Sequence, residues 1–161
     1  MINNSIYKFI ASLSCLLLIL FCALIFIMSA QNGSESSEVS ENIVNGALGV
    51  DKDRENYKHA LFIVRKCAHF FEYAVLSILA FAFVILLHRS IVKYKKSLII
   101  SFCFSVIYAI TDEIHQLFVP GRAGKITDVL IDACGAFWGI TVCYIVIRVV
   151  IKKQAERSSA C

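Results

Sequence analysis

Acidic, basic and hydrogen-bonding side chains occur at close spacing in an otherwise apolar sequence. The candidate site residues are Lys66, His69, Glu72, Tyr73, Asp112, Glu113, Gln116, Arg122, Asp128 and Asp132. Histidine and carboxylates can accept and donate protons, while lysine and arginine can bind phosphate or stabilise charge in a transition state. These residue types therefore indicate proton-transfer or phosphate-binding chemistry.

Four of these residues are candidate catalytic groups, namely Lys66, His69, Asp112 and Asp128. The others are candidate binding residues of the same site. The structural alternative is that Lys66 only extends toward the membrane surface, or that buried acids pair with basic residues only to hold helices together. Both interpretations stay open from the sequence.

Neither a metal site nor a cofactor site is predicted. A histidine with carboxylates can ligate a divalent metal, but the chain has no H-E-x-x-H or comparable spacing. The seven cysteines form no C-x-x-C pair and their number is odd, so a zinc site or a disulfide framework is not expected. No partner and no ligand role are identified by the sequence for His59, His88 and His115.

Long apolar stretches must position these side chains. Hydrophobic residues make up 58% of the chain and charged residues 17%, against about 45–50% and about 25% in soluble domains. A helix needs about 20 mostly apolar residues to cross a bilayer, and such stretches occur at 9–30, 67–88, 97–118 and 129–151. We therefore predict an all-α, four-transmembrane-helix bundle, a single domain over residues 1–161, multi-pass in the cell membrane. The formal net charge of +4 is too small to indicate nucleic-acid binding, so the lipid bilayer is the expected partner.

The basic residues predict the orientation of these helices, because lysine and arginine concentrate on the cytoplasmic side of short loops. The link between the second and third stretches and the C-terminal tail carry Arg89, Lys93, Lys95, Lys96, Arg148, Lys152, Lys153 and Arg157. Both termini are therefore predicted to be cytoplasmic. Residues 31–65 then form an outer loop, and residues 119–127 form an outward-facing turn.

The outward-facing segments carry further local signals. Residues 31–50 are rich in Ser, Asn, Glu and Gly, which predicts a mobile loop. From Asn56 the pattern predicts one long helix that continues into the second apolar stretch. Residues 120–125 contain a proline and two glycines, which predicts a tight turn. Thr127 is the expected N-cap of the last helix, and Asp128 suits its first turn.

Helical spacing gathers the polar residues on particular helix faces. Lys66, His69 and Tyr73 fall on one side of a helix, because residues three and four apart share a face. Asp128 and Asp132 are likewise one turn apart, and the G-x-x-x-G sequence that follows lets another helix approach closely. Ionisable groups within a span usually face the bundle interior or a water-filled cavity. We therefore expect one outward-opening cavity.

Together these motifs resemble the VanZ-like membrane protein family. The similarity is carried by Met28-Ser29-Ala30-Gln31-Asn32-Gly33, Lys66-x-x-His69-x-x-x-Tyr73, Asp112-Glu113-x-x-Gln116, Arg122, Asp128 and Gly135. The family is named for an accessory protein of glycopeptide-resistance clusters, so the resemblance implies an envelope protein linked to teicoplanin tolerance. Asp132 departs from the family, many of whose members have asparagine there, and this extra carboxylate makes the expected cavity more acidic.

Three functions remain open. The first, which we favour, is binding at the outer face, with Lys66 and Arg122 contacting the phosphates of a lipid-linked cell-wall precursor or an anionic lipid. The second is a membrane-embedded hydrolase or transferase acting on a lipid-linked cell-wall substrate, with His69 as acid or base. The third is a small proton-coupled exporter, which is less favoured because the polar groups gather at one face. The sequence does not set the oligomeric state.

Overall fold

Every regular element is a helix in the part of the chain that the computed structural model describes, residues 4–31, 41–48, 56–89 and 91–159. The long helices are α1 (Asn4–Ser29), α3 (Asn56–His88), α4 (Tyr94–Gln116) and α5 (Ile126–Ser159). Each of these four is long and apolar enough to cross a membrane. The prediction of an all-α fold with four such helices is confirmed, while the cytoplasmic location of the termini stays a prediction.

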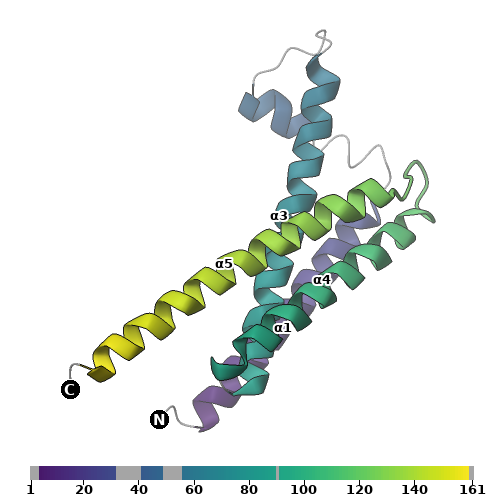
Figure 1. Cartoon of the computed structure of the whole chain (residues 1–161). Coiled ribbons are helices and arrows are strands. Elements are labelled where there is room, and N and C mark those ends of the chain that lie inside the picture. Colours follow the sequence, from purple (N-terminus) through teal and green to yellow (C-terminus); the bar gives the residue numbers. More distant parts are fainter. Residues whose placement is uncertain (1–3, 32–40, 49–55, 90, 160–161) are drawn as a thin grey trace.

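Helix α3 is at the centre of the arrangement. It contacts α1, α4 and α5, and α4 contacts α1 and α5 as well. Figure 1 shows both chain ends on one side of the molecule and the α4–α5 turn on the other. Successive long helices therefore run in opposite directions, so the end of α1, the end of α4 and the start of α5 lie on the same side.

The first turns of α3 project beyond the other long helices (Figure 1). The helix begins at Asn56 and continues without interruption to His88. This confirms the prediction of one long helix that starts well before the apolar stretch at 67–88. Its projecting turns give the chain a helical surface on the side of the α4–α5 turn.

A short helical segment packs beside these first turns. It comprises residues 41–48 and includes the π-helix η1 (Val44–Leu48), which contacts α3. Val44 is fully buried, and the hydroxyl of Tyr57 donates a hydrogen bond to Oδ1 of Asn45 over 3.2 Å. These contacts order a stretch that was predicted to be a mobile loop, so that prediction is wrong here. The rest of the predicted loop, residues 32–40 and 49–50, lies outside the described residues.

Helices α3 and α5 approach closely along two glycines. A Cβ atom at Gly135 would overlap the backbone of Phe70, and one at Gly139 would overlap the carbonyl of Ala74. Both glycines are buried, and the same face of α5 continues to the buried Cys143. The G-x-x-x-G sequence therefore packs against α3, as its spacing predicted.

A row of serines gives α4 a face of small side chains, as the two glycines do for α5. The side chains of Ser97, Ser101 and Ser105 are fully buried. Each hydroxyl donates to the carbonyl four residues earlier, Ser101 to Ser97 over 2.8 Å and Ser105 to Ser101 over 3.0 Å. Ser97 likewise donates to Lys93 over 3.3 Å. The hydroxyls of Ser101 and Ser105 are thus satisfied within α4 itself, which lets neighbouring helices pack against short side chains.

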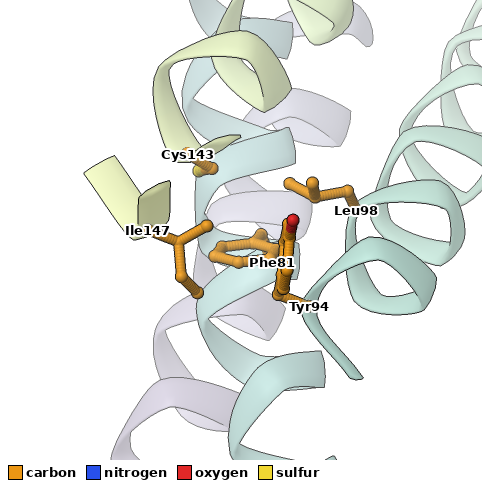
Figure 2. Close-up of a cluster of buried hydrophobic side chains, with 5 residues drawn as sticks. All are labelled: Phe81, Tyr94, Leu98, Cys143 and Ile147. Atoms are coloured by element: carbon orange, nitrogen blue, oxygen red, sulfur yellow. The ribbon is translucent and has the colours of Figure 1, made fainter. Parts of the chain in front are cut away.

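An apolar cluster fills the space between α3, α4 and α5 on the side of the chain ends. It contains Phe81, Tyr94, Leu98, Cys143 and Ile147, whose side chains point toward one another in Figure 2. Ile78, Ile85, Ile140 and Ile151 pack around it. The buried charged side chains lie in the other half of the bundle, on the side of the α4–α5 turn.

Candidate functional site

The α4–α5 turn holds Arg122 beside the helix ends. The backbone N–H of Arg122 donates to the carbonyl of Val119 over 3.1 Å, and Gly121 has a φ of 76°. A proline, here Pro120, followed by a glycine at positive φ is the pattern of a type II turn. The predicted tight turn is therefore confirmed, and its geometry depends on the glycine.

Helix α5 starts one residue before the expected cap. It begins at Ile126, and the backbone N–H of Asp128 donates to the carbonyl of Lys125 over 2.9 Å. The hydroxyl of Thr127 donates to Oδ1 of Asp128 over 3.2 Å. The prediction that Thr127 caps the helix is wrong, because Thr127 already lies inside it. Asp128 is in the first turn as predicted, where the helix dipole favours a carboxylate.

An ion pair between Lys66 and Asp128 joins α3 to α5. Nζ of Lys66 contacts Oδ1 of Asp128, and each side chain is only 12% exposed. The ammonium of Lys66 also lies 5.3 Å from the ring centroid of Phe62. Each charge is therefore neutralised by the other. This geometry fits the structural alternative better than a catalytic role for these two residues.

His69 lies among carboxylates of two helices. Its Nδ1 is 3.7 Å from Oδ1 of Asp132 on α5 and 4.0 Å from Oε2 of Glu72 on α3. The side chain of Asp132 is fully buried, whereas that of Glu72 is 25% exposed. The structure thus brings together the histidine of the second apolar stretch and the deeper of the two acids at the start of α5.

The acids at the end of α4 have different surroundings. Nε2 of Gln116 donates to Oδ2 of Asp112 over 3.2 Å, and both side chains are buried. Glu113 is buried too, but its Oε2 accepts the backbone N–H of Lys125 over 2.8 Å. Glu113 therefore fixes the end of the α4–α5 turn, while Asp112 points into the bundle.

Several buried polar atoms lack a hydrogen-bond partner among the described residues. They include the hydroxyls of Ser29 and Tyr73, one oxygen each of Asp112 and Glu113, and both oxygens of Asp132. An unpaired buried polar group costs about 1–3 kcal/mol. A group of them at one end of the bundle indicates a site that exchanges hydrogen bonds with water or with a ligand.

Two cavities adjoin at this end of the bundle, because they share Arg65, His69 and Arg122 in their walls. The large cavity has a volume of about 260 Å³, and its wall also includes Gln116, Gly121, Ala123, Lys125 and Asp128. The small cavity has a volume of about 80 Å³ and extends between α1 and α3. Its further polar residues are Ser29, Gln31, Glu72 and Asp112, and its apolar residues include Ile25, Met28 and Val64.

The predicted site residues divide into two groups. Six of them line one or both cavities, namely His69, Glu72, Asp112, Gln116, Arg122 and Asp128. The other four are Lys66, Tyr73, Glu113 and Asp132, which are not among the lining residues. Lys66, Glu113 and Asp132 contact residues of the site through the interactions above, and Tyr73 is fully buried on α3.

Arg65 is a site residue that sequence reasoning missed. It lines both cavities together with Arg122, and neither guanidinium has a carboxylate within 4.0 Å among the described residues. Burial, and then the neighbouring charge of Arg65, lower the pKa of Arg122. The available signal was spacing, since Arg65, His69 and Glu72 follow i, i+4, i+7 on one face of α3.

Two of the other histidines have partners that the sequence did not identify. Nδ1 of His88 is 2.8 Å from the hydroxyl of Ser97, which ties the end of α3 to α4. The ring of His115 stacks on Phe26 of α1 with a centroid distance of 4.4 Å. Both contacts are interhelical packing contacts, which short-range sequence patterns do not reveal. His59 is exposed near the start of α3.

The site has the groups for two kinds of chemistry. Paired guanidinium groups can bind a phosphate through several charge-assisted hydrogen bonds, and His69 can accept a proton. Among the described residues, no group of three or more His, Cys, Asp or Glu side chains is placed to hold a metal ion.

Comparison with protein families gives a match over most of the chain. Residues 14–148 match the family model of VanZ/LLP1. No curated protein and no solved structure matches the chain.

Proposed function

Because the chain belongs to the VanZ/LLP1 family, we propose that it binds an anionic lipid or a lipid-linked cell-wall precursor at the outer face of the cell membrane. By holding such an envelope component, it contributes to teicoplanin tolerance. Four helices long and apolar enough to cross a membrane support its multi-pass location. The proposal extends the resistance role that the family resemblance implies to a specific site on this chain.

The pair of arginines in the cavity walls carries this proposal. Arg65 and Arg122 both line the large and the small cavity, and no carboxylate of the described residues forms an ion pair with either. Two like charges around a shared space repel each other, and a bound anion removes that repulsion. Lys125 adds a third basic residue to the large cavity, whose acid Asp128 is already paired with Lys66.

The small cavity supports a lipid rather than a free anion as the ligand. Its wall includes Ile25 and Met28 of α1 and Val64 of α3. Met28 is 37% exposed, so the cavity borders a surface of α1 that faces lipid in a membrane. A lipid can then place its phosphate between the arginines while its chain remains in the bilayer.

Export is not proposed. The half of the bundle toward the chain ends is filled by the apolar cluster around Phe81 and Tyr94 (Figure 2). A proton-coupled carrier needs polar groups along a path through the membrane. The buried charged side chains of the described residues lie on the other side.

Binding is tested with the purified protein in nanodiscs. Phosphatidylglycerol is titrated against phosphatidylcholine, which carries no net charge, and bound lipid is measured by native mass spectrometry. We expect preference for phosphatidylglycerol in the wild type, and at least about a tenfold weaker preference in Arg122→Gln, since one charge-assisted contact contributes about 1.5–3 kcal/mol. The matched control is Arg157→Gln, an exposed arginine near the end of α5. If Arg122→Gln and Arg157→Gln lose the preference for phosphatidylglycerol equally, or if the wild type has no such preference, the proposed site is contradicted.

Tolerance is tested in a susceptible Gram-positive host, with vancomycin as the comparison drug. The wild type should raise the inhibitory concentration of teicoplanin, whereas Arg122→Gln and Asp112→Asn, at equal membrane abundance, should not. Arg157→Gln should protect as well as the wild type. If the wild type gives no protection, the resistance part of the proposal is wrong. If all variants protect equally, tolerance does not depend on this cavity.

A further inference from the structure

The imidazole of His69 lines both cavities, and one of its nitrogens is buried. Nδ1 is buried and lies 3.7 Å from Oδ1 of Asp132. The same side chain lines both the large and the small cavity. Because Nδ1 is turned toward Asp132, Nε2 is the ring nitrogen that a molecule in the cavities can meet.

Asp132 is placed to fix the state of that imidazole. It is fully buried, lines neither cavity, and has no hydrogen-bond partner for either oxygen among the described residues. At 3.7 Å from Nδ1, which is beyond hydrogen-bond distance, a carboxylate acts through its charge and stabilises the imidazolium that forms when Nε2 takes a second proton. Asp132 is therefore a positioning residue, which acts on a ligand only through His69.

The same space holds the groups that stabilise negative charge. Arg65 and Arg122 line both cavities with His69, and Lys125 lines the large one. Phosphoryl transfer depends mainly on positioning and on cations around the oxygens of the transferred group. Lys66 is not available for this role, because its ammonium is paired with Asp128.

We propose that this site hydrolyses a lipid diphosphate, with His69 as the general base and with Arg65 and Arg122 holding the phosphates. The proposal rests on the proposed function, since the anionic lipid must first bind in the same cavities. It goes further by assigning a reaction and a substrate class. The apolar wall of the small cavity, formed by Ile25, Met28 and Val64, accepts the first part of the lipid chain.

The step is a hydrolysis with water as the co-reactant. Nε2 of His69 takes a proton from water, and the water oxygen forms a bond to the terminal phosphorus. The bond between that phosphorus and the bridging oxygen breaks, and its electron pair stays on the bridging oxygen. The products are inorganic phosphate and a lipid monophosphate, and His69 returns its proton to water. A diphosphate suits the site because its leaving group departs as a stable phosphate anion and requires no separate acid.

The test uses the full-length protein in detergent micelles with farnesyl diphosphate as the probe. Release of inorganic phosphate is measured alongside binding of a methylene-bridged analogue that cannot be hydrolysed. We expect His69→Gln to lower the rate at least about 100-fold, the range of general base catalysis, while analogue binding changes less than about twofold. The matched control is His59→Gln, an exposed histidine on the same helix, which should leave both quantities unchanged.

The positioning role of Asp132 has its own readout. Asp132→Asn removes the charge that stabilises the imidazolium but keeps the size of the side chain. We expect kcat to fall at least about tenfold with KM nearly unchanged, because the substrate does not contact Asp132. A rise in KM with kcat unchanged overturns this role and places Asp132 in binding.

The outcomes separate the two proposals. Analogue binding without phosphate release above the His69→Gln level overturns hydrolysis and leaves the binding function standing. If the analogue does not bind, or if its binding does not depend on Arg65 and Arg122, both the binding function and the hydrolysis are overturned. Retained binding in His69→Gln also shows that this variant is folded, so a lost rate cannot be assigned to misfolding.

Discussion

The ion pair between Lys66 and Asp128 should act mainly as a link between α3 and α5. Removing one partner of a buried pair leaves the other charge without compensation, which costs about 3–5 kcal/mol. Each side chain is 12% exposed, so we expect the low end, about 3 kcal/mol, for Lys66→Met or Asp128→Asn. The double variant leaves no unpaired charge and should lose less than about 1 kcal/mol, which corresponds to a coupling energy of about 5 kcal/mol.

The chain contains a single tryptophan that reports on this interface. Trp138 of α5 lies 6.2 Å from Phe70 and 6.4 Å from Phe71 of α3, measured between ring centroids. Separation of the two helices therefore changes its fluorescence during unfolding by sodium dodecyl sulfate in mixed micelles. The exposed Lys58→Met on α3 is the control and should change the unfolding free energy by less than about 0.5 kcal/mol. If the double variant loses the sum of the single losses, about 6 kcal/mol, the two charges are not coupled and the reasoning is refuted.

Three further predictions use the same protein. Gly135→Ala should lose about 1–3 kcal/mol in the fluorescence titration, because its Cβ overlaps the backbone of Phe70. Gly46→Ala, whose Cβ meets nothing within 4 Å, is its control, and equal losses would contradict the close approach of α3 and α5. Gly121→Ala places an alanine at a φ of 76° and should lose about 1 kcal/mol in the same titration; an unchanged unfolding curve would mean that the turn adapts. A C-terminal alkaline phosphatase fusion should be inactive in cells and a fluorescent protein fusion bright, since the tail beyond Arg148 is predicted to be cytoplasmic; the reverse result would invert the predicted topology.

Most of the helical framework could be predicted because its signals are local. Bilayer thickness sets the length of an apolar stretch, so hydropathy alone located all four long helices. The segment at 41–48 gave no such signal, because its order comes from burial of Val44 and from the bond between Tyr57 and Asn45. The start of α5 was also placed wrongly. Thr127 has the residue type of a cap, but its hydroxyl bonds to Asp128 inside the helix.

The composition of the site was predictable, whereas its pairing was not. Helical periodicity placed His69 and Asp132 on polar faces, but which acid would face the imidazole depends on the register between α3 and α5. That register is set by the contact of Gly135 with Phe70, two residues that lie far apart in the sequence. Arg65 was missed because it directly precedes Lys66 in the sequence, and only the structure shows which of the two basic side chains lines the cavities.

The serine row of α4 bears on how the chain enters the membrane during synthesis. Of the four long helices, α4 has the lowest mean hydropathy, 1.6, partly because serine counts as polar. Yet Ser101 and Ser105 each donate their hydroxyl hydrogen to a carbonyl four residues earlier in α4. A donor satisfied within its own helix does not require a neighbour to shield it from hydrocarbon. The serine hydroxyls of α4 therefore give no reason for its insertion to wait until α5 has been translated.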